Sequence, residues 1–216
     1  MTKNLNTEIS NYALLVFLGA IWAASFVAIK FSNLIFNPIE VGFYRTFIGS
    51  IFLFLAVKLR GGSISLFSEN TRIYSLIGFL NASVPFTLLP YGLITLPSNI
   101  GVIILSANPF LALVLAHFFT LDEKLSLRKV IGSIIGFSGV VFAVGVEIFV
   151  SDWDSLISAI AIYVGASSYV ISNLIIRRIS HLPSDMVTMN TLFWGSIWLL
   201  PLVLIYGNFQ NIEFSH

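Results

Sequence analysis

Residues 73–121 read IYSLIGFLNASVPFTLLPYGLITLPSNIGVIILSANPFLALVLAHFFTL, and this stretch decides the fold. It contains no Asp, Glu, Lys or Arg, yet it holds four of the seven prolines of the chain: Pro85, Pro90, Pro97 and Pro109. A helix that crosses a bilayer needs about 20 predominantly apolar residues. The stretch therefore predicts two membrane spans, Ile73–Leu96 and Ser98–Phe119, with a tight turn at Pro97 between them.

Prolines and polar side chains inside these two spans favour a position beside a cavity. Lipid cannot satisfy the backbone groups that a proline frees, so broken helices face protein or water. Pro85 removes the hydrogen-bond donor of the Asn81 carbonyl, and Pro109 does the same for Leu105. These carbonyls, with the amides of Asn81 and Asn108, could contact a polar substrate at mid-depth. The alternative is a kink that only shapes helix packing.

Composition places the whole chain in the membrane. Of its 216 residues, 57% are hydrophobic and 10% charged, and the mean hydropathy is +0.94. Soluble domains carry about 25% charged residues. The first apolar segment is long for a signal peptide, and more spans follow it, so we interpret it as a retained helix. The chain is therefore predicted to be an all-α integral membrane protein.

Seven apolar segments have the length of a membrane helix. They are Tyr12–Ile29, Ile39–Val57, Ile73–Leu96, Ser98–Phe119, Val130–Val150, Leu156–Ile176 and Met186–Tyr206. Of the 11 Lys and Arg residues, all except Lys30 and Arg45 fall on one side of these segments. The positive-inside rule then predicts a multi-pass protein of the plasma membrane or bacterial inner membrane, with a cytoplasmic N-terminus.

Three short matches suggest an internal repeat. Residues 23–27 resemble 166–170, residues 37–38 resemble 182–183, and residues 49–51 resemble 195–197, with offsets of 143, 145 and 146. The period contains five spans, and an odd number inverts the second copy in the membrane. The prediction is an inverted-repeat bundle with a five-helix first repeat (1–150) and two helices of a second (151–216). Seven of an expected ten helices are present, so we expect either a fragment or a genuine truncation.

An ordered set of motifs resembles the EamA transporters of the drug/metabolite transporter superfamily. The motifs are Trp22–Lys30, Arg45–Phe47, Ser98–Phe110, Leu121–Leu125 and Gly132–Val140. The sequence departs from the family pattern at Ala23 and Asp122, where glycine is usual. The resemblance implies a ten-helix carrier, built from two repeats, for small metabolites such as amino acids, acting mainly in efflux.

The second apolar segment carries Arg45, the one basic residue well inside a predicted span. An Arg at the centre of a membrane helix costs about 2.5–3.5 kcal/mol on insertion scales. Two interpretations stay open: anchoring at the outer interface, with Glu40 as a partner, or binding of an anion or carboxylate. In the first segment, Trp22 and Ser25 either face the cavity or pack in the core.

The fourth segment separates its polar residues by helical spacing. Ser106 and His117 fall on one face and Asn108 on another, so they cannot line one cavity. His117 is either an interfacial histidine or, if buried in the path, a group that couples transport to protons. The full set of predicted substrate-binding residues is Trp22, Ser25, Arg45, Asn81, Pro85, Tyr91, Ser106, Asn108 and Pro109.

The sequence favours a carrier over an enzyme. The three histidines are scattered, and we find no nucleophile motif, phosphate loop or metal-ligand spacing, so no cofactor, metal or nucleic-acid partner is expected. The expected partners are a small-molecule metabolite and the lipid bilayer. Gly132, Gly136 and Gly139 favour a helix contact or a homodimer. The leading hypothesis is a secondary transporter that works by alternating access; the alternative is a truncated, non-transporting membrane protein or scaffold.

Overall fold

The computed structural model describes residues 2–62, 64–120, 124–144 and 152–207, and these residues form helices and their connections without a strand. The elements are α1 (Thr2–Ser32), α2 (Pro38–Leu59), α3 (Thr71–Gly78), the π-helical turn η1 (Phe79–Ser83), α4 (Val84–Thr95), α5 (Ser98–Leu105), α6 (Asn108–Phe119), α7 (Leu127–Val144), α8 (Trp153–Arg178) and α9 (Ser184–Tyr206). The predicted all-α fold is confirmed.

Six stretches of the described chain are long and apolar enough to cross a membrane. They are Ser10–Ser32, Pro38–Leu59, Thr71–Thr95, Ser98–Phe119, Trp153–Arg178 and Ser184–Tyr206. Each coincides with one of the predicted segments. The remaining predicted segment, 130–150, is helical in α7 as far as Val144, and its last residues lie outside the described part of the chain.

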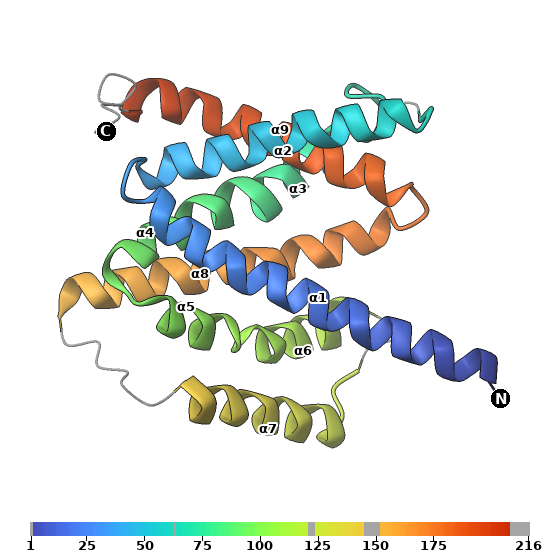
Figure 1. The fold of residues 1–216 in the computed structure, drawn as a ribbon, viewed down its shortest axis with the longest axis vertical. Helices are drawn as coiled ribbons and strands as arrows, with labels where there is room; N and C mark the ends of the chain where they lie inside the picture. The colour runs from blue at the N-terminus through green and yellow to red at the C-terminus, as the bar shows by residue number, and fades with distance from the viewer. Residues whose placement is uncertain (1, 63, 121–123, 145–151, 208–216) are drawn as a thin grey trace.

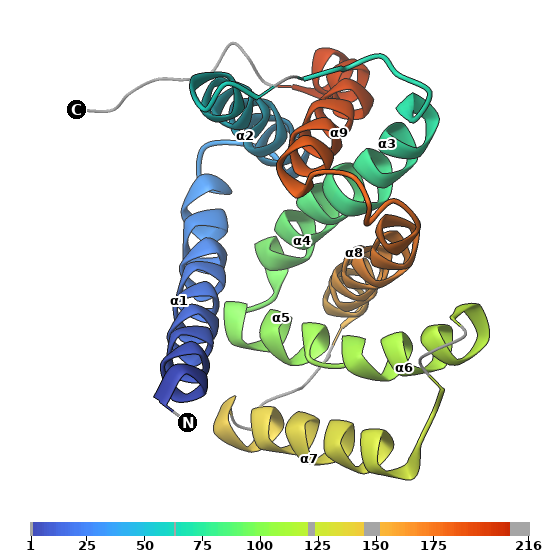
Figure 2. The ribbon, with the colours of Figure 1, turned by 90° about the vertical axis from the view of Figure 1, so that its right-hand side faces the viewer.

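The helices form a layered bundle. In Figure 1, α2 and α9 lie at the top, α4 and α8 in the middle, and α5 with α6 below them, while α7 forms the lower edge. Figure 2 shows the same order and places α1 along one side. The starts of α1 and α7 and the ends of α2 and α8 lie at one end of the bundle. The predicted clustering of basic flanks at one membrane face agrees with this arrangement.

Helices that the predicted repeat equates run in opposite directions. Asn37 caps α2: its Oδ1 accepts from the Glu40 backbone N–H at 3.0 Å, and the Glu40 carboxylate accepts from the Asn37 N–H at 2.8 Å. The Asn37 amide also donates to the Tyr206 carbonyl at 3.0 Å, so the start of α2 meets the end of α9. The α1–α8 pair is likewise antiparallel (Figure 1). An inverted repeat requires each of these two helix pairs to be antiparallel. The predicted boundary between the repeats, at residue 150, lies outside the described residues.

Proline chemistry shapes the span Thr71–Thr95. Pro85 has no N–H to donate, and the helix passes through a π-helical turn just before it, where the Val84 N–H donates to the Phe79 carbonyl. The Ser83 hydroxyl donates to the Gly195 carbonyl of α9 at 2.9 Å. The predicted kink at Pro85 is therefore a π-bulge that is tied to a neighbouring helix.

Glycines allow this span to approach α8 and α9 closely. A Cβ atom added to Gly78 would lie 2.8 Å from the Gly195 backbone nitrogen and 2.9 Å from the Thr191 carbonyl oxygen. A Cβ on Gly92 would lie 2.6 Å from the Ser158 carbonyl oxygen of α8. Such distances are far shorter than a carbon contact of about 3.5–4.0 Å. The backbones therefore touch where a side chain would separate them.

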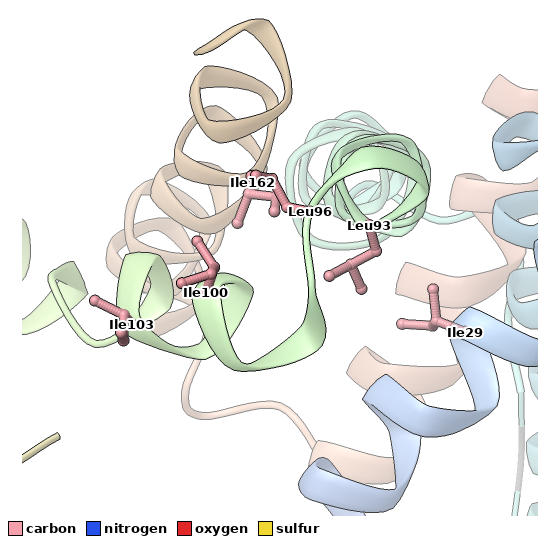
Figure 3. Close-up of a cluster of buried hydrophobic side chains, with 6 residues drawn as sticks. All are labelled: Ile29, Leu93, Leu96, Ile100, Ile103 and Ile162. Atoms are coloured by element: carbon pink, nitrogen blue, oxygen red, sulfur yellow. The ribbon is translucent and has the colours of Figure 1, made fainter. Parts of the chain in front are cut away.

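An apolar cluster fixes α1 and α5 against this centre. It consists of Ile29 of α1, Leu93 and Leu96 at the end of α4, Ile100 and Ile103 of α5, and Ile162 of α8. Figure 3 shows Ile29 facing Leu93, and Ile162 lying above Ile100. The Asn33 amide, just after α1, donates to the Pro90 carbonyl at 2.8 Å. These contacts set the position of α1 relative to α4.

We expect the substitution Gly78→Ala to destabilise the protein by about 1–3 kcal/mol, because overpacking forces backbones apart. The matched control is Gly136→Ala in α7, where nothing lies within 4 Å of an added Cβ. Without a clash, alanine favours the helix by about 0.5–1 kcal/mol. Thermal unfolding in detergent measures both. Equal effects of the two substitutions would contradict the close-approach interpretation.

Candidate functional site

The side chain of Arg45 extends from α2 toward α1 and α4. Its Nη2 donates to the Ser25 hydroxyl of α1 at 3.3 Å. Its Cζ lies 4.1 Å from the ring centroid of Phe86 of α4, which is a cation–π distance. All three residues are half-buried. The guanidinium is therefore directed into the protein at a junction of three helices.

A fourth helix contributes Tyr169. Tyr169 of α8 is half-buried, and its phenol lies near enough to the Arg45 guanidinium for the two groups to influence each other electrostatically. Arg45, Ser25, Phe86 and Tyr169 are called the Arg45 cluster below. Its first three members come from the first predicted repeat and Tyr169 from the second. The cluster thus joins the two predicted repeats.

Ser25 and Arg45 lie inside their apolar spans and away from the helix ends. Ser25 precedes the end of α1 at Ser32, and Arg45 follows the start of α2 at Pro38, by seven residues each. At about 1.5 Å per residue, both backbone positions lie about 10 Å from the same end of the bundle.

The neighbours of the guanidinium are uncharged. Its contacts among the described residues are the Ser25 hydroxyl and the Phe86 ring, and the Tyr169 phenol is near enough to act on it electrostatically. Glu40, which the sequence suggested as a partner, lies five residues before Arg45 and so projects from a different side of α2. One of its carboxylate oxygens accepts the N–H of Asn37 in the helix cap. The local structure thus uses Glu40 to start α2.

Asn81 and Pro85 join the third span to α8. The Asn81 amide donates to the Ser172 hydroxyl at 2.5 Å, and that hydroxyl donates to the Tyr169 carbonyl at 3.0 Å. Pro85 is buried, and its Cα lies 3.4 Å from the position of a Cβ on Gly165. Both residues therefore make contacts between helices in this structure.

The predicted residues of the fourth span separate, as their helical spacing requires. The Asn108 amide donates to the Ala166 carbonyl of α8 at 3.0 Å, and its Oδ1 is buried without a partner among the described residues. Ser106 and Pro109 instead line a cleft of about 660 Å³ between α6 and α7, with Lys129 at its border. The structure thus directs the two faces to different neighbours.

Two further predicted residues have exposed side chains. Trp22 is 70% exposed and Tyr91 is 44% exposed among the described residues. Of the nine predicted substrate-binding residues, the structure brings Ser25 and Arg45 into direct contact. The other seven lie at helix contacts, in the α6–α7 cleft or on exposed faces.

Sequence reasoning did not include Phe86 or Tyr169 among the site residues. A signal for each was present. Tyr169 stands opposite Phe26 in the repeat match that also aligns Ser168 with Ser25. Phe86 precedes Pro90 by four residues, so its carbonyl loses the backbone donor of an ordinary helix. The sequence therefore carried a signal at both positions: the repeat match at Tyr169 and the spacing to Pro90 at Phe86.

The bond between Asn81 and Ser172 is open to a double-mutant cycle. We expect Asn81→Ala and Ser172→Ala to be non-additive, with a coupling energy of about 0.6 kcal/mol, the average for hydrogen bonds between membrane helices. Unfolding of the two single variants and the double variant in detergent gives this value. Additive effects would show that the amide has another role.

Comparison with known proteins identifies the class and then the family. The fold, with six helical stretches in its described part that are long and apolar enough to cross a membrane, defines a multi-pass helical membrane protein. A family model described as the EamA-like transporter family matches residues 10–145. The chain belongs to this family of membrane transporters, as the motif resemblance predicted.

Several relatives carry transport names. An uncharacterized transporter, YoaV, of Bacillus subtilis (strain 168) is 26% identical over 198 residues, which cover 91% of this chain and 67% of that protein. An uncharacterized transporter of Archaeoglobus fulgidus is 31% identical over 120 residues, covering 56% of this chain and 42% of the relative. An uncharacterized transporter in the trpA 3' region of Buchnera aphidicola is 26% identical over 211 residues, covering 93% and 67%. These names indicate transport.

A solved structure shares the fold. A protein described only as "Crystal structure of protein" superposes with a TM-score of 0.62 at 15% identity, covering 85% of this chain and 66% of the solved one. The chain therefore spans about two thirds of the length of that structure. At this identity the match bears on the helical arrangement.

Proposed function

We propose that the protein acts in a secondary carrier that exports small metabolites, amino acids among them, by alternating access around the Arg45 cluster. One observation carries the proposal. A charged side chain within a membrane span faces the protein interior, at a junction of helices from both predicted repeats. Membership of a transporter family supports it.

The membrane environment gives this observation its weight. Placing an Arg at the centre of a membrane helix costs about 2.5–3.5 kcal/mol, and such residues usually mark substrate or ion paths. In inverted-repeat carriers the binding site lies near the bilayer midplane, where the repeats meet. The Arg45 cluster brings Ser25, Arg45 and Phe86 of the first predicted repeat close to Tyr169 of the second, which supports a site where the repeats meet.

Transport then needs two states that bind the metabolite from opposite sides. The span Thr71–Thr95 packs closely against α8 and α9, and we assign these helices to the part that stays together during transport. The Arg45–Ser25 bond joins α2 to α1 by one long hydrogen bond. The metabolite would shift the balance between the states only through its different affinity for each.

The charge distribution supplies the orientation of the proposed carrier. Basic residues flank the ends of α2 and α8 and the start of α7, which share one end of the bundle (Figure 1). We place this end, and the N-terminus with it, in the cytoplasm of a cell membrane under the positive-inside rule. The proposed direction of transport, export, follows from the family resemblance.

A flux measurement tests the function. The protein is reconstituted into liposomes that are loaded with unlabelled amino acids, and uptake of labelled leucine, phenylalanine and threonine is followed by counterflow. We expect saturable uptake above that of protein-free liposomes. Absence of flux for every metabolite tested would contradict the carrier and favour a non-transporting membrane protein.

The absence of native cysteine allows a test of the path itself. We expect Ser25→Cys to react with a water-soluble thiol reagent, because an alternating-access site is hydrated in at least one state. The metabolite that shows flux should slow this labelling. The control is Ser180→Cys in the exposed turn after α8, where the reagent has access and the same metabolite should have no effect. Labelling of Ser25→Cys that ignores the metabolite would place the path elsewhere.

A further inference from the structure

The guanidinium of Arg45 has more donors than the described neighbours use. A guanidinium carries five N–H donors in a fixed plane. Among the described residues, one of them, on Nη2, donates to the Ser25 hydroxyl at 3.3 Å. Phe86 meets the group with its ring, 4.1 Å from Cζ, and so takes up no N–H in a conventional hydrogen bond. The remaining donors are available to a ligand.

The charge of Arg45 is also uncompensated within the described cluster. The Ser25 hydroxyl and the Phe86 ring contact it, the Tyr169 phenol acts on it electrostatically, and none of these groups carries a negative charge at neutral pH. A charge that is removed from water is stabilised by a close opposite charge with good hydrogen bonds. The site therefore has the properties of a receptor for one anion.

We propose that Arg45 binds the carboxylate of the transported metabolite, so that the substrates of this carrier are small monocarboxylates, including amino acids, which present their ionised α-carboxylate. The inference rests on the proposed function, because it names the substrate class of the same site. The planar fork of Arg matches a carboxylate in two parallel hydrogen bonds. The Ser25 hydroxyl, which accepts a hydrogen bond from the guanidinium, is positioned to contact the same carboxylate.

The single charge favours a carboxylate over a phosphate. A phosphate monoester carries about −1.5 to −2 charges at pH 7. In the described cluster, Arg45 supplies one positive charge, and its neighbours add none. The single positive charge of one guanidinium matches the single negative charge of one carboxylate. Binding of inorganic phosphate is therefore measured as well, to distinguish a carboxylate site from a phosphate site.

A purely structural role for Arg45 makes a different prediction. If the guanidinium only tied α1 to α2, its loss would lower stability without changing which ligands bind. Arg45→Gln keeps a side-chain donor that can reach Ser25 but removes the charge. Arg45→Lys keeps the charge but loses the planar fork. Selectivity between an acid and its carboxamide, which lacks the negative charge, separates the two roles.

Equilibrium binding to the full chain in detergent tests the proposal. The probes are L-leucine, L-phenylalanine and L-threonine, each with its carboxamide, and inorganic phosphate. We expect at least one acid to bind about tenfold or more tightly than its amide, as a hydrogen-bonded charge requires. Arg45→Gln should lose that preference by weakening the acid alone, and Arg45→Lys should keep part of it.

The matched control neutralises another basic residue near the same end of the bundle. Lys30→Gln removes the half-buried Lys30 at the end of α1 and should leave the preference for the acid unchanged. Thermal unfolding of each variant confirms that it is folded. If Arg45→Gln does not fold, the preference for the acid over its carboxamide, measured in the wild type and in Arg45→Lys, still tests the proposal.

Several outcomes would overturn the proposal: equal binding of acid and amide by the wild type, binding of phosphate in place of the acids, or an unchanged preference in Arg45→Gln. The proposed function is judged separately, by flux. Flux of amides and acids alike would keep the carrier and reject the carboxylate site. Selective binding of acids without flux of any metabolite would keep the site and reject the carrier.

Discussion

The structure depends on backbone contact between the span Thr71–Thr95 and the helices α8 and α9. Gly78 meets Gly195, and Gly92 meets the Ser158 carbonyl, at distances that leave no room for a methyl group. Without a hydrophobic force between helices in lipid, such small residues and the hydrogen bonds they permit hold membrane helices together. The Ser83 hydroxyl and the Asn81 amide add bonds to α9 and α8 at the same interfaces.

The same principle positions the Arg45 cluster. A Cβ on Gly42 of α2 would lie 2.8 Å from the Phe86 carbonyl oxygen, which Pro90 deprives of its usual helical donor. Gly42 and Arg45 are three residues apart and share a face of α2. The close approach of α2 at Gly42 therefore brings Arg45 over the Phe86 ring. A proline, a glycine and an arginine together place one charge at the junction of four helices.

Much of the fold was predictable, because membrane spans are recognised from the length of apolar segments and from the distribution of charged residues around them. The turn at Pro97 and the divergent faces of Ser106 and Asn108 also agree with the structure, since proline geometry and helical periodicity are local properties. The partners of Arg45 were harder to predict. Sequence patterns left anchoring and ligand binding both open. Phe86 and Tyr169 each carried a signal in the sequence, but only the packing of four distant segments shows that Phe86 contacts the guanidinium and that Tyr169 lies near it.

The central claim is that a carboxylate occupies the space beside Arg45, between the predicted repeats. A structure determined with 4-iodo-L-phenylalanine bound, its iodine located by anomalous scattering, tests this most directly. The account predicts the ligand carboxylate at about 2.7–2.9 Å from the guanidinium nitrogens, the range of charge-assisted hydrogen bonds. Iodine and carboxylate density away from α1, α2, α4 and α8, with Arg45 still bound only to Ser25, would contradict it.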